Sequence, residues 1–321
     1  MTEYPIGSRE QIGWVEEDGG YKTLTSNTMA DDGEIVGYNT VITPNMSLAW
    51  SEILNSGADT PEIKTMVKGN KIINFTLTFV PYNWTFLKYC THPTVTNVDH
   101  TTYNSHTWSI ANSIKSFTLE WANRMETDNA ITLTGCTIKD FKIKFSRGTG
   151  PTDGLVTVEA NCVASDYSSS SSLTTLTPPT ATPLRFFDTK LTYNSSEVVE
   201  VNSGEIRFNN GITEDDSRYC NDTYADTLAE PIPTVKRYGV TMNINASDST
   251  YFDAWDNGDV LSGTNKIRFY KSTHDWLEIA LTNARVGVAP VPSTNLTGLN
   301  KIDIVMVPTT MAVTGEDGNT Y

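Results

Sequence analysis

Runs in which apolar and polar residues alternate dominate this sequence. In Lys71–Val80, the apolar residues Phe75, Leu77 and Phe79 alternate with asparagine and threonine. Successive side chains of a strand point to opposite faces, so this pattern is typical of a sheet with one buried face. The same pattern predicts strands at Ser116–Trp121, Phe141–Phe145, Leu155–Ala160, Gly239–Asn245, Lys266–Tyr270, Leu277–Leu281 and Lys301–Val307. We therefore predict an all-β fold.

Two short helices are predicted within it. Asn83 precedes the first, over residues 84–90, and Asp248 precedes the second, over residues 249–256. Asn and Asp side chains accept hydrogen bonds from the free N–H groups of a first helical turn. Gly258 follows the second segment and suits a helix C-terminus, because glycine adopts the left-handed conformation found there.

A segment rich in serine, threonine and proline divides the chain near its middle. Residues 164–183 read ASDYSSSSSLTTLTPPTATP and have no apolar periodicity. This composition is typical of a linker. We predict a first core over residues 1–163 and a second core over residues 184–321.

The two sides of this segment resemble each other. Matching Asn83 with Asp248 aligns the strand Phe75–Phe79 with Val240–Ile244. Further on, residues 116–121 align with 266–271, residues 131–138 with 279–286, and Val156 and Val158 with Ile302 and Ile304. This order predicts an internal duplication that gives two tandem cores resembling β-sandwiches or barrels. The alternative is that alternating strands align by chance.

The charge balance excludes some functions. The chain has 38 acidic and 23 basic residues and a net charge of −15, so it does not suit a protein that grips nucleic-acid phosphates over its whole surface. No apolar stretch approaches the roughly 20 residues of a transmembrane helix. The N-terminus lacks the basic start and apolar run of a signal peptide. We therefore expect a soluble protein made inside the cell.

The cysteines and histidines give only weak signs of a site. Four cysteines in a chain of this length favour buried free thiols, although a Cys136–Cys162 disulfide stays open. Thiolate and imidazole are zinc ligands. The cluster Cys90, His92, His100 and His106 nevertheless matches no compact zinc motif, so we favour a solvated loop and expect no metal or cofactor.

Local catalytic motifs are missing from the sequence. It contains no GxSxG nucleophile elbow, no phosphate-binding loop and no GxGxxG fingerprint. Asp256 and Asp259 do not have the spacing of an EF-hand. We predict that the protein is not an enzyme, although a β-sandwich hydrolase with paired carboxylates stays an alternative.

The opening of the chain carries a family resemblance. Arg9–Tyr21 reads REQIGWVEEDGGY, and it resembles the N-terminus of tail tube proteins of tailed viruses of bacteria and archaea. The order of strand, short helix and paired strands also resembles their β-sandwich core, which larger members carry twice. Two segments depart from this core: residues 91–115 are longer than a simple turn, and residues 209–233 form a long insertion. They are either arms between rings or decorations on the outside.

This resemblance implies a function and a set of partners. Duplicated-core members form trimers whose six cores make a pseudo-hexameric ring, and the rings stack into a tube. The tube is a conduit for ejection of genome DNA, which passes without specific binding. Implied partners are further copies of the chain, the tape measure, the tail tip or baseplate and the tail terminator, with no membrane. The implied location is the virion tail, assembled in the host cytoplasm.

Acidic residues on the predicted strands are candidates for the wall of such a channel. We predict that Glu120, Glu159, Glu278 and Asp303 face the lumen, because each alternates with apolar neighbours. They could also face the outer solvent or pair with basic residues across strands. The strand residues Lys142, Lys144, Lys266 and Arg268 are then expected away from the channel or neutralised beside it.

A non-catalytic carbohydrate-binding or adhesin-like tandem β-sandwich is the alternative function. Its sugar platforms would be exposed aromatic residues, for which Trp84, Trp255 and Trp276 are candidates. The missing secretion signal favours the tail tube interpretation over this one.

Overall fold

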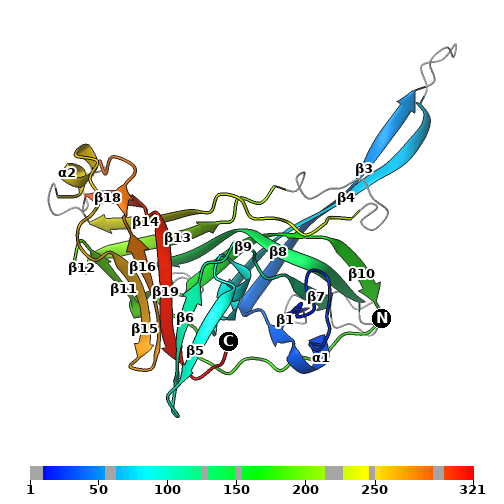
Figure 1. The fold of residues 1–321 in the computed structure, drawn as a ribbon, viewed down its shortest axis with the longest axis horizontal. Coiled ribbons are helices and arrows are strands. Elements are labelled where there is room, and N and C mark those ends of the chain that lie inside the picture. The colour runs from blue at the N-terminus through cyan, green and yellow to red at the C-terminus, as the bar shows by residue number, and fades with distance from the viewer. Residues whose placement is uncertain are drawn as a thin grey trace.

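The computed structural model describes residues 10–54, 63–123, 129–148, 154–213, 227–245, 250–291 and 300–321. Strands dominate these residues and the helices are short (Figure 1), so the all-β prediction is confirmed. Each predicted strand segment lies in or overlaps a strand. The strands are β1 Glu10–Glu16, β2 Glu34–Ile35, β3 Tyr38–Leu54, β4 Ile63–Val80, β5 Thr94–Asp99, β6 Asn104–Ser109, β7 Phe117–Asn123, β8 Asn129–Ser146, β9 Val156–Ala164, β10 Asp166–Ser170, β11 Thr189–Tyr193, β12 Ser196–Val198, β13 Val201–Asn209, β14 Arg237–Asn245, β15 Lys266–Ser272, β16 Asp275–Thr282, β17 Arg285–Val286, β18 Lys301–Val307 and β19 Thr310–Asp317. The helices are α1 Met29–Asp32, η2 Thr85–Tyr89, η3 Phe186–Asp188 and α2 Thr250–Asp256.

Eight strands form one continuous antiparallel sheet, which we name the wall. Its order is β3-β4-β9-β8-β13-β14-β18-β17. The first four strands come from the N-terminal side of residues 164–183, and the last four come from the C-terminal side. The two groups join where β13 pairs with the second part of β8, with Phe208 opposite Phe141.

A second layer of strands covers one face of the wall. The first part of β8 leaves the wall and pairs with β7 and β10, and β7 continues the layer to β1 and β2. On the C-terminal side, a separate sheet has the order β12-β11-β15-β16-β19-β6-β5. The apolar core fills the space between these layers and runs from Phe75 and Phe141 to Val240 and Ile304 without interruption.

The strand registers repeat between the two halves of the chain. Phe75 lies opposite Cys162, and its aligned residue Val240 lies opposite Met306. Leu77 lies opposite Ala160, as Met242 lies opposite Ile304. The sequence alignment of β4 with β14 therefore agrees with the way in which these strands pair.

The registers correct two of the sequence alignments. Since Phe79 pairs with Val158 and Ile244 with Ile302, it is Val158 and Ala160 that correspond to Ile302 and Ile304, two residues further along than predicted. Trp121 pairs with Ile131 and Ile267 with Ile279, so Trp121 corresponds to Ile267, which differs by four residues from the predicted alignment. Shifting an alignment by two or four residues keeps the same side chains on the buried face. The apolar–polar alternation alone therefore does not reveal such a shift.

A residue in the left-handed backbone conformation lies at the same bend in each half. Gly135 has a φ of 65° and its aligned residue Asn283 has a φ of 48°. At this point the chain passes from the second layer into the wall, along β8 in one half and from β16 to β17 in the other. A side chain at Gly135 would lie within 3 Å of Lys22, Ser165 and Tyr21. Glycine and asparagine are the residues that most readily adopt this conformation.

The predicted helices occur with changed bounds. The first is the 3-10 helix η2, which begins one residue later than predicted, so its N-cap is Trp84 and not Asn83. The Asn83 side chain still accepts a hydrogen bond from the Thr85 N–H at 3.2 Å. The second is α2, which ends at Asp256; Gly258 follows it with a φ of 64° and donates its N–H to the Trp255 carbonyl. Asp248 lies outside the described residues.

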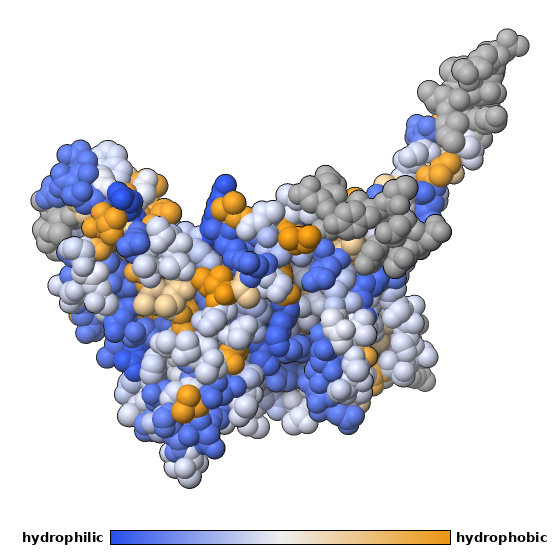
Figure 2. All heavy atoms as spheres, in the orientation of Figure 1, coloured by the Kyte–Doolittle hydropathy of each residue, from blue (hydrophilic) through white to orange (hydrophobic). Residues whose placement is uncertain are grey.

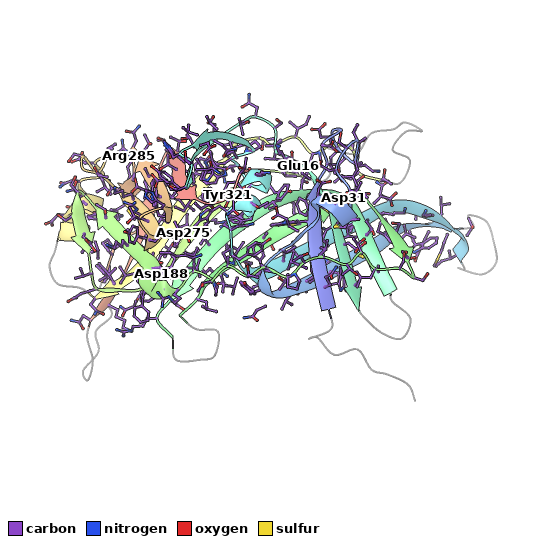
Figure 3. The ribbon with its side chains drawn as sticks, turned by 90° about the horizontal axis from the view of Figure 1, so that it is seen from below. Glu16, Asp31, Asp188, Asp275, Arg285 and Tyr321 are labelled. Carbon is purple, nitrogen blue, oxygen red and sulfur yellow. The ribbon has the colours of Figure 1, made fainter. Side chains whose placement is uncertain are left out.

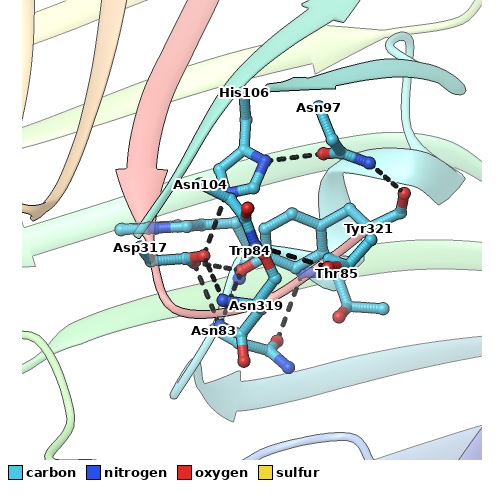
Figure 4. A network of polar contacts seen from close by, with 10 residues as sticks. Asn83, Trp84, Thr85, Asn97, Asn104, His106, Asp317, Asn319 and Tyr321 are labelled. Atoms are coloured by element: carbon cyan, nitrogen blue, oxygen red, sulfur yellow. Dashed lines mark hydrogen bonds and ion pairs between the residues drawn. The ribbon is translucent and has the colours of Figure 1, made fainter. Parts of the chain in front are cut away.

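Strand pairing and a polar network connect the two halves of the chain. The β5–β6 hairpin belongs to the N-terminal half, yet β6 pairs with β19 in the C-terminal sheet. Figure 4 shows the His106 ring hydrogen bonded to the Asn97 Oδ1 at 2.6 Å and to the Asp317 carboxylate at 3.0 Å, next to the partly buried ring of Tyr321. The Tyr321 hydroxyl also accepts from the Trp84 N–H at 2.9 Å. The C-terminal residues thereby fasten the hairpin and η2 to the second half.

The segment predicted as a linker contains one strand. Asp166–Ser170 forms β10 against β8, and residues 171–183 follow without regular structure. Division of the chain into cores 1–163 and 184–321 stays a prediction. In the part of the chain that the structure describes, no helix has the length and apolarity needed to cross a membrane.

Candidate functional site

The face of the wall that points away from the second layer is polar and hollowed. Alternation puts threonine and asparagine on it, such as Thr76 and Asn161, whose side chains are hydrogen bonded at 2.8 Å. One hollow of about 480 Å³ lies over β8, β9, β13, β14 and β18, and another of about 490 Å³ lies over β3, β4, β8, β9 and the end of β13. This polar face crosses both halves of the chain, and it is our candidate functional site.

The basic residues at the centre of this face are neutralised by acidic neighbours. Glu159 of β9 forms ion pairs with Lys142 at 3.5 Å and with Lys144 at 2.5 Å. The hydrogen bond from Lys144 lowers the pKa of Glu159, which keeps the carboxylate charged. Arg207 of β13 donates to Asp140 at 2.7 Å, and this bond raises the pKa of the guanidinium.

The C-terminal part of the face is also charged, because alternation puts Arg237 of β14 and Lys301 of β18 on it. Asp303 is exposed on β18 and accepts a hydrogen bond from the Asn243 amide at 2.7 Å. Thr241 is exposed on the same face. The wall as a whole therefore presents hydroxyl, amide and charged groups to solvent, and the charged groups at its centre are paired.

The four acidic residues predicted for a lumen lie in two different places. Glu159 and Asp303 are on the polar face of the wall, on the equivalent strands β9 and β18. Glu120 is on β7 of the second layer, 8% exposed, and accepts from the Thr174 N–H and hydroxyl at 3.0 and 3.1 Å. Glu278 is on β16 and pairs with Lys266 at 2.9 Å.

The basic strand residues divide in the same way. Lys142 and Lys144 lie on the wall with Glu159 between them, whereas Lys266 and Arg268 lie on β15 of the C-terminal sheet. Arg268 stacks over the Trp276 ring at 4.3 Å. The sequence analysis did not single out Glu205 and Arg207 of β13. Their alternation with Ile206 and Phe208 is a signal that would have found this strand.

The cysteine and histidine residues considered for a metal do not come together. His92 is fully buried, 4.0 Å from Cys90, and its Nε2 contacts the Met311 carbonyl at 3.2 Å. His106 belongs to the C-terminal network, and the His100 ring stacks on Tyr103. No group of three potential ligands occurs within the described ranges. The prediction of a solvated loop is wrong for His92 and His106, which lie in the interior.

The cysteines are free thiols where the structure describes them. Cys90, Cys136 and Cys162 are buried and unbridged, so Cys136 and Cys162 do not form the disulfide considered above. Burial raises the pKa of the Cys90 thiol to about 11, which keeps it protonated and unreactive at neutral pH. Cys220 lies outside the described residues.

Burial of His92 makes a pH-dependent contribution to stability. Desolvation lowers the pKa of His92 to about 4 from a reference value of 6.5. Between these values the unfolded chain binds a proton that the native protein does not, so stability is full above pH 6.5 and is lost as the pH falls toward 4. The loss is about 3 kcal/mol when complete.

We expect His92→Gln to flatten this part of the pH profile. Free energies of unfolding from urea titrations at pH 7 and pH 4.5 would differ less in the variant than in the parent, by about 2 kcal/mol. His100→Gln, on the exposed β5–β6 turn, is the control and should keep the parental difference. Equal pH dependence in His92→Gln and the parent would contradict the assignment.

Aromatic residues considered as sugar platforms are at least partly covered. Trp84 is 3% exposed and packs on Phe86 and Phe269, so it belongs to the core. Trp276 is half-buried beneath Arg268. These positions offer little open ring surface for a sugar.

The fold is thus an all-β protein whose antiparallel wall has one buried face and one polar face, and the polar face crosses both halves of the chain. A search of curated proteins found no match. A family model described as phage tail tube protein matches residues 7–314. The chain therefore belongs to the phage tail tube protein family, and it is a structural component of the virion tail.

Proposed function

We propose that three copies of this chain form a ring and that such rings stack into a tail tube through which genome DNA is ejected. The observation that carries this proposal is the wall, to which each half of the chain contributes four strands in equivalent order. Three chains then supply six equivalent units, which is a pseudo-sixfold ring. Closing the sheet on itself also removes edges that would otherwise pair indiscriminately.

The polar face of the wall is the proposed inner surface. Unpaired lysine or arginine side chains would bind DNA phosphates and retard its passage. Lys142, Lys144 and Arg207 are instead paired with Glu159 and Asp140. Of the predicted lumen residues, Glu159 and Asp303 keep that role in this proposal, and Glu120 and Glu278 belong to the second layer.

The projecting β3–β4 arm is the proposed contact between rings. Figure 1 shows β3 and β4 extending away from the rest of the molecule, and Figure 2 shows apolar surface on the arm. Trp50 is 57% exposed and Met66 is 54% exposed. Their positions, opposite Lys68 and Glu52, put both on the same face of the hairpin. Exposed apolar surface of this kind favours contact with another protein.

The segments considered earlier as arms fit this role less well. Residues 94–109 form the β5–β6 hairpin, which is held on β19 of the same chain. Residues 214–226 of the second segment lie outside the described residues. Further proposed partners, supported by family membership alone, are the tape measure, the tail tip or baseplate and the tail terminator, with assembly in the host cytoplasm.

Electron microscopy of the concentrated protein or of isolated tails tests the proposal. We expect hollow rings with three chains and six similar units around the axis, stacked with the arm reaching the next ring. Rings of six chains, or tubes in which the second layer lines the bore, would contradict it.

Reversing charge on the inner surface should affect DNA passage without affecting assembly. We expect Glu159→Lys with Asp303→Lys to leave tubes intact and to slow genome ejection, because freed lysines bind phosphates. The effect should weaken as salt is raised. The matched control is Glu197→Lys with Glu278→Lys, which makes the same charge change outside the wall. Equal ejection rates for both variants would refute the assignment of the inner surface.

A further inference from the structure

We propose that the ring closes by pairing of β3 in one copy with residues 285–288 in the next copy, in the register of the internal β8–β13 junction. This rests on the proposed function, because it names the surfaces through which the copies meet. The partner of each surface is a second copy of this chain.

The internal junction shows how two units join within one chain. Phe208 of β13 lies opposite Phe141 of β8, with ring centroids 5.9 Å apart, and Ile206 lies opposite Ile143. The four side chains are at most 1% exposed. The junction therefore combines a ladder of strand pairing with a dry apolar contact on the core side of the wall.

Strand β3 is the counterpart of β13 by its pairing. Phe75 lies opposite Pro44, and the equivalent residue Val240 lies opposite Ile206. Two residues along, Ile73 lies opposite Met46, as Tyr238 lies opposite Phe208. Met46 therefore occupies the position in the first half that Phe208 occupies in the second.

Residues 285–288 are the counterpart of the second part of β8. Val286 lies opposite Met306, as Ile138 lies opposite Cys162. The Gly287 N–H continues this register with a bond to the Val305 carbonyl at 2.8 Å. In the equivalent register Phe141 lies opposite Ala160, the counterpart of Ile304, so Val288 corresponds to Phe141.

The counterparts of the buried junction residues are exposed. Met46 is 36% exposed and Val288 is 54% exposed, whereas Phe208 and Phe141 are both 0% exposed. Both exposed residues have the core-facing alternation of their strands. A second copy placed by the internal register would set Met46 opposite Val288 and would cover both.

The two surfaces lie at opposite ends of the wall, as ring closure requires. Figure 1 shows β3 and β4 at one end of the molecule and β18 at the other, and Figure 3 shows Arg285 of β17 at the left, away from the blue β3–β4 strands at the right. A contact between different surfaces of identical chains closes into a ring when its rotation fits.

Disulfide trapping tests the register in assembled tubes. In a Cys220→Ser background, which leaves only the buried native thiols, we would introduce Met46→Cys and Val288→Cys together. Residues directly opposite in antiparallel strands have Cα atoms about 4.5–5.5 Å apart, within reach of a disulfide. We expect oxidation to convert most of the protein into covalent dimers and closed trimers on denaturing gels.

Control variants separate this proposal from others. Met46→Cys with Val199→Cys places the second thiol at an exposed site away from the junction and should give monomers. Dimers of Met46→Cys alone would show that two β3 edges meet, which would overturn the proposal. Three-chain rings without cross-links in the double variant would overturn this pairing and leave the proposed function standing, whereas six-chain rings of the parent would overturn the function itself.

Hydrogen exchange of the parent protein tests the same pairing without any substitution, and it applies if the double variant fails to assemble. We expect the amides of residues 45–47 and 287–289 to exchange at least tenfold more slowly in tubes than in unassembled protein. Unchanged exchange at both segments in assembled tubes would overturn the proposal.

Discussion

Replacing residues 49–70 by an Asn-Gly turn should yield protein that forms rings but no tubes. Leu48 and Lys71 lie opposite each other, so a two-residue turn can close the shortened β3–β4 hairpin. None of the described side chains in the removed segment is buried, so the core stays intact. The tube would lose the proposed contact between rings, which electron microscopy and sedimentation would detect as free rings or subunits.

A milder variant shows whether apolar contacts of the arm are responsible. Trp50→Ser with Met66→Ser keeps the hairpin and removes the two exposed apolar side chains that share its face. We expect shorter or fewer tubes at the same protein concentration. Tubes of normal length from the shortened-arm variant would exclude the arm as the contact between rings.

Phe208→Ala should be among the most destabilising single substitutions in the chain. The Phe208 ring is fully buried where the two halves join, and it contacts Phe141, Tyr238 and His92 at centroid distances of 5.9, 6.1 and 5.6 Å. Truncating a buried phenylalanine removes its transfer free energy and leaves a cavity, which costs about 3–5 kcal/mol. Urea titration monitored by tryptophan fluorescence would measure this loss.

Thr241→Ala is the matched control on the opposite face of the wall. Thr241 is exposed and lies opposite Glu205 of β13, so it samples the same pair of strands. We expect a change within about 0.5 kcal/mol, as for most surface substitutions. Similar losses in the two variants would show that the junction does not depend on its apolar side.

The alternation of apolar and polar residues predicted those strands in which every second side chain is apolar and buried. β4, β8, β9 and β14 each carry three or more buried apolar residues at alternate positions, such as Phe141, Ile143 and Phe145. β3 and β13 were not predicted, although both belong to the wall. In β3, Ile42, Met46 and Leu48 do alternate with polar residues, but Pro44 stands among them, and proline argues against an interior strand.

The candidate site was predictable only in part. Glu159 and Asp303 were identified as polar residues between apolar neighbours, and the structure places both on the polar face of the wall. Glu120 has the same alternation, yet it lies in the second layer and is hydrogen bonded to Thr174. A sequence pattern shows that a residue and its neighbours point to opposite faces, but not which sheet contains the strand.

The sequence by itself determined the all-β class, the polar and apolar faces of the predicted strands, the hydrogen bond of Asn83 at the start of η2 and the correspondence of Phe75–Phe79 with Val240–Ile244. These features depend on local geometry, because side-chain direction and capping involve residues close in the chain. Only the tertiary structure decided that β13 pairs with β8, that β6 pairs with β19 and that Met46 and Val288 are left exposed. These features depend on contacts between residues far apart in the chain, and alternation is compatible with many such pairings.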